Sequence, residues 1–154
     1  MPISVDNDRS VWDVEAILRK ILNQLPDDCD KIVWLDSDVY FTNLHWVKQV
    51  SYLLKYYIAA QPFSVIDRGD NGTSINSLAF SIHQAGKSVL QHTPQQGFPG
   101  KAWAFRRKML DKDGLRFHLP LCEKVSWASW AEKIWENAEG SISFVPGGVT
   151  TLKN

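Results

Sequence analysis

The sequence is poor in cysteine and has no long apolar run, and each absence excludes a class of protein. Its 154 residues include two cysteines, Cys29 and Cys122, which are too few for a disulfide framework and form no C-x-x-C pair for zinc. No run of about 18 apolar residues is present, so the sequence predicts no transmembrane segment. The first eight residues lack the charged and apolar regions of a signal peptide. We therefore expect a reduced, cytoplasmic protein.

The chain also has no excess of charge of either sign. Lysine and arginine together number 17, aspartate and glutamate together number 17, and the formal net charge is zero. A balanced charge provides no general field for holding nucleic acid or an anionic membrane surface, so we expect no nucleic-acid partner. The abundant residue is tryptophan, which occurs seven times. Tryptophan packs well in protein cores, and it also stacks on sugar rings and bases.

The spacing of apolar residues predicts an alternation of helices and strands. Helices are expected over 11–25, from near Asn43 to Leu54, over 106–111 and over 127–138, and a weak helical signal covers 75–84. Strands are expected over 31–35, 56–61, 101–105 and 141–145. The first of them is almost continuously apolar, which is typical of a central strand buried on both faces. This alternation favours a single α/β domain with a layered sheet.

The strongest chemical signal is Asp36-Ser37-Asp38, directly after the apolar strand expected over 31–35. Ligands of open α/β sheets collect beyond the carboxyl ends of the strands. Two carboxylates one residue apart on a turning backbone can share one hard cation, and Mg²⁺ or Mn²⁺ prefers such oxygen ligands. The alternative is that Asp36 and Asp38 only cap the following turn and helix, and the tripeptide alone does not decide between them.

The surrounding sequence resembles the GT-A glycosyltransferases, and more narrowly their family 2 or galactosyltransferase-like branch. The segment from Ile32 to Asn43 is similar to the metal-binding Asp-x-Asp segment of that family. Three later segments match in the expected order: 60–63 resembles the next strand, 100–107 the Gly-x-Ala-Trp-Ala-x-Arg-Arg element, and 142–147 a late strand and turn. The resemblance covers most of residues 12–150 and implies a mixed sheet flanked by helices.

The resemblance also implies roles for individual residues in a transfer from a nucleotide-sugar donor to an unknown acceptor. Asp36 would contact the ribose or the metal, and Asp38 would ligate Mn²⁺ or Mg²⁺ directly. The other implied donor-site residues are Gly100 and Trp103 around the sugar, Arg106 at a phosphate, and Gln61 at the donor. A core role for Trp103 and a structural role for Arg106 are the alternatives.

The chain departs from the family pattern at three places, one of which is the absence of the histidine near the last strand that often completes the metal shell in that family. It opens at the helix before the metal strand, so we expect one GT-A-like domain over 1–154 that lacks most of the amino-terminal nucleotide-binding half. An acidic base after the Gly114-Leu115 turn is also missing, and Glu123 or His118 could substitute for it because a base needs only reach and a suitable pKa. A sheet that is incomplete could expose an edge, which would favour a homo-oligomer.

Three other functions remain open at this stage. A non-catalytic fragment or degenerate relative would keep the fold without turnover. An aspartate-nucleophile phosphatase also places Asp-x-Asp after a buried strand, although Tyr40 stands where that class has Thr or Val. A carbohydrate-binding module would use the tryptophans on a β face, which the helical signals disfavour.

Overall fold

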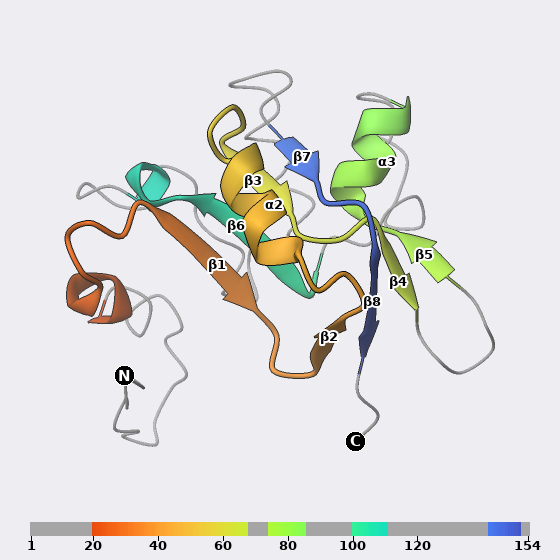
Figure 1. The fold of residues 1–154 in the computed structure, drawn as a ribbon, viewed down its shortest axis with the longest axis horizontal. Coiled ribbons are helices and arrows are strands. Elements are labelled where there is room, and N and C mark those ends of the chain that lie inside the picture. Colours follow the sequence, from red (N-terminus) through yellow and green to blue (C-terminus); the bar gives the residue numbers. More distant parts are fainter. Residues whose placement is uncertain (1–19, 68–73, 86–99, 111–141, 152–154) are drawn as a thin grey trace, which may run out of the picture.

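The computed structural model describes residues 20–67, 74–85, 100–110 and 142–151. These residues form two four-stranded sheets with helices beside them (Figure 1). The chain is therefore a mixed α/β structure, as the alternation of apolar patterns predicts. No helix in the described ranges is long and apolar enough to cross a membrane.

The first sheet is mixed, with one antiparallel strand between parallel ones. Its strands, in spatial order, are β1 (Lys31–Leu35), β6 (Ala102–Arg106), β3 (Ala59–Gln61) and β7 (Ile142–Phe144). The strand β6 pairs antiparallel with both β1 and β3, and β3 pairs parallel with β7. It follows that β1, β3 and β7 run in one direction and end at the same edge of the sheet.

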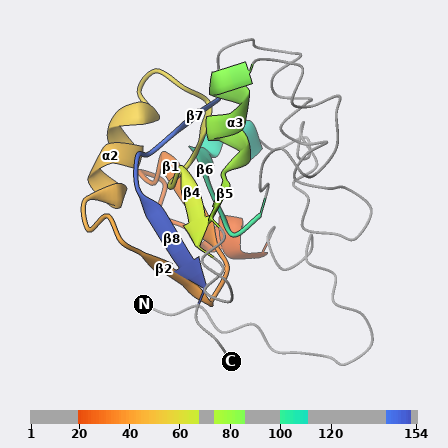
Figure 2. The same cartoon turned by 90° about the vertical axis from the view of Figure 1, so that its right-hand side faces the viewer.

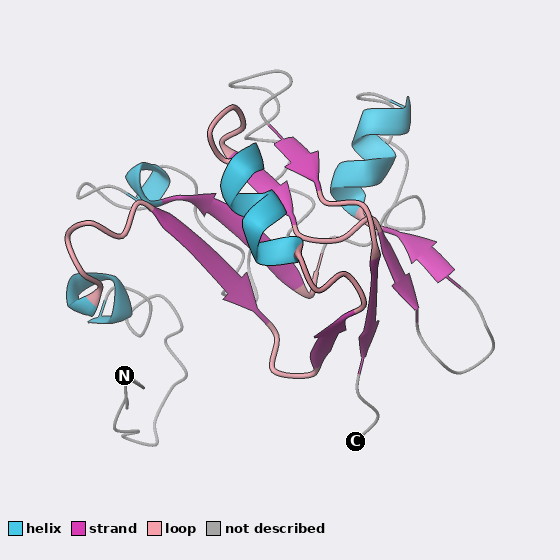
Figure 3. Cartoon of the chain, viewed as in Figure 1, coloured by secondary structure: helices cyan, strands magenta, loops and turns pink. Residues whose placement is uncertain are grey.

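The second sheet is built from the chain segments that leave this edge. Its strands, in spatial order, are β2 (Val39–Phe41), β8 (Gly148–Thr151), β4 (Val65–Asp67) and β5 (Ser74–Asn76). Each of β1, β3 and β7 continues directly into a strand of the second sheet, namely β2, β4 and β8 (Figure 3). The three crossing segments are 36–38, 62–64 and 145–147, so Asp36 and Asp38 lie at the seam between the two sheets.

Two helices lie on opposite sides of the first sheet, α2 (Trp46–Leu53) and α3 (Leu78–Ala85) (Figure 2). Val50 and Leu54 are buried against Ala104 of β6 and Val145, which fastens α2 to its face. Ser77 caps α3, because its Oγ accepts a hydrogen bond from the N–H of Phe80 at 3.2 Å. A short 3-10 helix, η1 (Arg107–Leu110), follows β6, and residues 20–24 form the described part of an earlier helix.

A second apolar cluster holds the two sheets together. It consists of Phe63, Ile66, Ala102 and Val149, which are at most 1% exposed. Ala102 opens β6 in the first sheet, whereas Ile66 and Val149 belong to the second. The seam that carries Asp36 and Asp38 therefore rests on a packed core.

Several predicted elements are confirmed and others are corrected. The strand over 31–35 has the expected bounds, but it is not central: it stands first in the strand order and its residues are mostly half-buried. The strand expected from residue 56 begins at Ala59, because Tyr56 and Tyr57 both donate backbone hydrogen bonds to Leu53 and so prolong the end of α2. The helix expected over 127–138 and most of the one over 11–25 lie outside the described residues.

Candidate functional site

The turn that carries the two aspartates is anchored at both ends. Before it, Leu35 pairs with Ala102, and the N–H of Asp36 donates to the carbonyl oxygen of Lys101 at 2.9 Å. After it, Val39 opens β2, which pairs antiparallel with β8. The position of the turn is thus set by one strand from each sheet.

The two carboxylates converge on a single cation, the ammonium of Lys101. Lys101 Nζ lies 2.7 Å from Oδ2 of Asp38 and 3.6 Å from Oδ2 of Asp36. The side chains of Asp36, Asp38 and Lys101 are 45%, 31% and 20% exposed, so the group is partly open to solvent. The two aspartates therefore aim their charges at the same place, as a shared cation site requires.

Lys101 has an unusual backbone conformation. Its φ is 74°, a left-handed value that residues with a β-carbon adopt uncommonly. The N–H of Ala102 donates to the carbonyl oxygen of Gly100 at 3.0 Å, which closes a three-residue turn around Lys101. Such strained turns persist only where surrounding contacts hold them, and they cluster at ligand sites. Here the turn brings the side chain of Lys101 to the aspartates.

The ionised form of Asp36 is disfavoured in the folded protein. Partial burial raises the pKa of Asp36, and the charge of Asp38 raises it further, against the opposing effect of Lys101. The ionised form of Asp36 is therefore incompletely compensated by its surroundings. A carboxylate in this state gains from any further positive charge placed beside it.

The donor set suits a hard divalent cation that keeps other ligands. Mg²⁺ is commonly held by one or two carboxylates together with water or phosphate oxygens. Asp36 and Asp38 supply two carboxylates, and the described ranges contain no cluster of three or more His, Cys, Asp or Glu that could hold a metal. A cation at this place would share the carboxylates with Lys101 or displace its ammonium.

Two other predicted donor-site residues lie at or near this seam. Gly100 belongs to the turn around Lys101 and is half-buried. Trp103 is fully buried in β6 and pairs with Trp34 of β1, so its ring is part of the interior of the protein. Gly100 thus lies next to the lysine that contacts the carboxylates, whereas Trp103 has the core position that was the alternative to a sugar contact.

The structure gives Gln61 and Arg106 contacts of another kind. Gln61 is fully buried, and its Oε1 accepts a hydrogen bond from the N–H of Ala79 at 2.7 Å, in the first turn of α3. Arg106 pairs with Lys31 at the start of β1, about 17 Å along the strand from Asp36. Its guanidinium donates to the carbonyl oxygens of Leu54 and Lys55 at 2.6 and 2.5 Å and so caps α2. The structure does not bring Arg106 to the aspartates.

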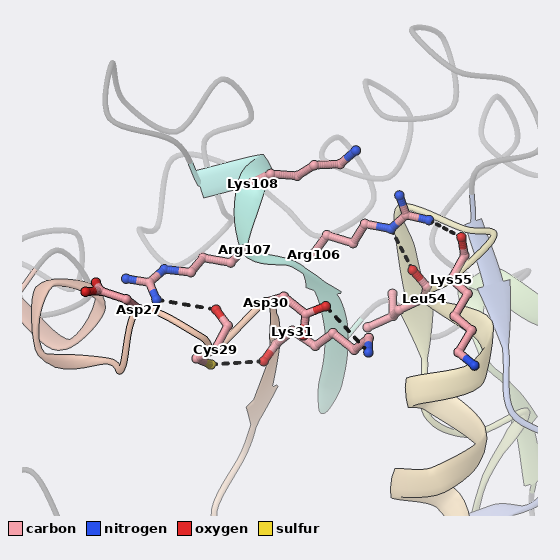
Figure 4. A pocket seen from close by; sticks show the side chains of 9 residues that line it. All are labelled: Asp27, Cys29, Asp30, Lys31, Leu54, Lys55, Arg106, Arg107 and Lys108. Carbon is pink, nitrogen blue, oxygen red and sulfur yellow. Dashed lines mark hydrogen bonds and ion pairs between the residues drawn. The ribbon is translucent and has the colours of Figure 1, made fainter.

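A basic hollow of about 620 Å³ surrounds Arg106 at this opposite edge (Figure 4). Its lining residues are Asp27, Cys29, Asp30, Lys31, Leu54, Lys55, Arg106, Arg107 and Lys108. Arg107 also donates to backbone carbonyl oxygens, those of Leu22, Pro26 and Cys29. Both guanidiniums are therefore engaged with the ends of helical segments.

The two predicted bases, Glu123 and His118, lie outside the described residues. Lys101, the partner of the two aspartates, was not among the predicted site residues. The strand was expected to begin at Lys101, and the structure begins it at Ala102; the antiparallel pairing of this strand with β1 is what places Lys101 beside the aspartates. No family model, no curated protein and no solved structure matches the chain.

Proposed function

We propose that the chain is a GT-A-like glycosyltransferase domain that binds a divalent cation and a nucleotide-sugar at Asp36 and Asp38. The observation that carries this proposal is the convergence of the two carboxylates on one position, 2.7 and 3.6 Å from a single cationic nitrogen. Aspartates that merely capped a helix would direct their oxygens to backbone N–H groups. Here they face a charge.

The arrangement of the resembling segments supports the same function. The segments 32–43, 60–63, 100–107 and 142–147 contribute β1, β3, β6 and β7, which together make up the first sheet. All four meet the seam at the carboxyl ends of the parallel strands, where α/β proteins bind their ligands. A sheet of mixed direction with helices on both sides also agrees with the GT-A architecture that the resemblance implies.

In this function Asp38 and Asp36 would hold Mn²⁺ or Mg²⁺, which would neutralise the diphosphate leaving group of the donor. The chain's own contribution is to fix the two carboxylates at the seam. Hydrogen bonding of Asp36 to Lys101 and the pairing of β2 with β8 restrict the turn before any ligand arrives. A preorganised pair loses less entropy on binding than a mobile one.

The test is calorimetric titration of the full chain with a UDP- or GDP-sugar in the presence of Mn²⁺. We expect binding by the wild type and a loss of about tenfold or more in Asp38→Ala, equivalent to about 1.4 kcal/mol for one charge-assisted contact. Asp28→Asn is the matched control, since Asp28 is an exposed aspartate before β1. Absence of binding, or binding unchanged in Asp38→Ala, would rule out the proposal.

A second measurement separates an active enzyme from a non-catalytic relative. Transfer of sugar to any member of a broad acceptor panel establishes activity. Binding of the cation and nucleotide-sugar without transfer identifies a non-catalytic relative. Release of phosphate from an aryl phosphate would instead support the phosphatase.

A further inference from the structure

The backbone of Lys101 is held in place, whereas its side chain is free to rotate away from the aspartates. Its carbonyl oxygen accepts the hydrogen bond of Asp36, and the three-residue turn holds its φ at 74°. The ammonium stands at the end of a flexible four-carbon stem, and the side chain as a whole is 20% exposed. Movement of the ammonium therefore needs only side-chain rotation, with the backbone unchanged.

The charges at the seam determine which ligand a movement of the ammonium would favour. With Lys101 in place, the three side chains carry a net charge of −1, from two carboxylates and one ammonium. A divalent cation that approaches alone meets carboxylates already paired with a positive group and is repelled by that group. A cation that arrives with a diphosphate brings negative oxygens to which the ammonium can transfer.

We propose that Lys101 is an exchangeable counter-ion that makes Asp36 and Asp38 select a cation–nucleotide complex over the free cation. This inference rests on the proposed function, and it assigns Lys101 a specificity-determining role that the resemblance does not contain. Before binding, the ammonium holds the two carboxylates together. On binding, it moves from the carboxylates to the diphosphate. Cation and nucleotide then bind with positive coupling, and linkage requires each to strengthen the other equally.

The experiment measures Mn²⁺ binding to the full chain by the loss of the free-ion signal in electron paramagnetic resonance, with and without saturating UDP. For the wild type we expect UDP to tighten Mn²⁺ binding about 5- to 50-fold. In Lys101→Met the free cation meets no competing ammonium, so binding without UDP tightens by a similar factor and the effect of UDP shrinks to about twofold or less.

Three further variants serve as controls for the charge of residue 101, for folding and for the position of the lysine. Lys101→Arg keeps the charge, so Mn²⁺ binding without UDP stays as weak as in the wild type. Lys101→Asn removes the charge with a residue that tolerates a positive φ, and it reproduces the effect of Lys101→Met if that variant folds poorly. Lys108→Met, a neutralised lysine at the opposite edge of the sheet, leaves both measurements unchanged.

The failures of the two proposals are distinguishable. Equal Mn²⁺ affinity of the wild type, Lys101→Met and Lys101→Asn without UDP would overturn the role of Lys101 and leave the cation site intact. Tighter binding in Lys101→Arg would also overturn it, because charge would then not be the cause. Absence of Mn²⁺ binding by every protein, even with UDP, would overturn the proposed function itself and this inference with it.

Discussion

Asp36 and Lys101 are joined twice, once through the backbone and once through their side chains. The N–H of Asp36 donates to the carbonyl oxygen of Lys101 at 2.9 Å, and Lys101 Nζ lies 3.6 Å from Asp36 Oδ2. The first contact fixes the end of β1 to the start of β6. The second responds to any charge that enters the seam, because the carboxylate can exchange one cationic partner for another.

The raised pKa of Asp36 predicts that its ionised carboxylate lowers the stability of the folded protein. A carboxyl whose pKa is higher in the folded state favours folding most at pH values below its ordinary pKa of 3.8, and this contribution is lost as the pH rises through the raised value. We expect Asp36→Asn to be more stable than the wild type at pH 7, with a melting temperature higher by about 1–2 °C. The difference disappears near pH 3.

Thermal denaturation followed by circular dichroism at both pH values measures this effect, with Asp28→Asn as the exposed control. A variant Asp36→Asn that is less stable than the wild type at pH 7 would show that its contact with Lys101 outweighs the cost of burial.

A substitution at Gln61 distinguishes a structural role of this side chain from a contact with the nucleotide-sugar donor. Its buried Oε1 accepts a hydrogen bond from Ala79, so Gln61→Leu leaves a buried N–H without this acceptor. We expect the free energy of unfolding in urea to fall by about 1–3 kcal/mol. Gln49→Leu is the control: Gln49 is exposed and accepts a hydrogen bond from Asn43, and we expect a change of about 0.5 kcal/mol or less. Unchanged stability together with lost nucleotide-sugar binding would instead support the donor contact.

Arg106 is expected to stabilise the fold without contributing to the proposed cation site. Arg106→Met removes the guanidinium that caps the carboxyl end of α2 and should lower the free energy of unfolding by about 1–3 kcal/mol. Binding of Mn²⁺ with UDP should not change in the folded variant. Lys108→Met provides the comparison for loss of one positive charge from the same hollow. Weakened nucleotide binding in Arg106→Met alone would restore its role at a phosphate.

Gly147 is placed where only a residue without a side chain fits. Its φ is 134°, and a β-carbon there would lie 2.9 Å from Cβ of Asn43. Gly147→Ala should therefore destabilise the protein by about 1–3 kcal/mol in urea denaturation. Gly148→Ala meets Thr42 Oγ1 at 3.3 Å without a left-handed φ, and a smaller loss is expected. An equal loss in the two variants would argue against backbone strain as the cause.

Sequence patterns predicted the first sheet far better than the second. The strands β1, β6 and β7 occur within one or two residues of their expected positions, because each lies in a run of mostly apolar residues that is visible in the sequence. The four strands of the second sheet were not predicted. Three of them have only three residues, too short for a period-2 alternation to stand out. Their pairing depends on partners far away in the sequence.

The candidate site shows the same division. Asp36 and Asp38 could be selected from the sequence because they follow an apolar strand, and the structure brings their carboxylates together. Lys101 could not be selected, since it reaches them only through the antiparallel pairing of β6 with β1. The contacts of Gln61 and Arg106 with helix ends were equally hidden, because each joins elements separated by at least 18 residues.

The pairing of β2 with β8 also determines at what point in protein synthesis the turn that carries Asp36 and Asp38 is held at both ends. Within the described ranges β8 is the strand that flanks β2, and Gly148 stands 110 residues after Asp38 in the chain (148 − 38). While the ribosome is still making that stretch, Val39–Phe41 lacks the strand with which it pairs. The turn before it is then held only at its β1 end. In a nascent chain the turn that carries Asp36 and Asp38 is therefore held at both ends only after residues 148–151 have been translated.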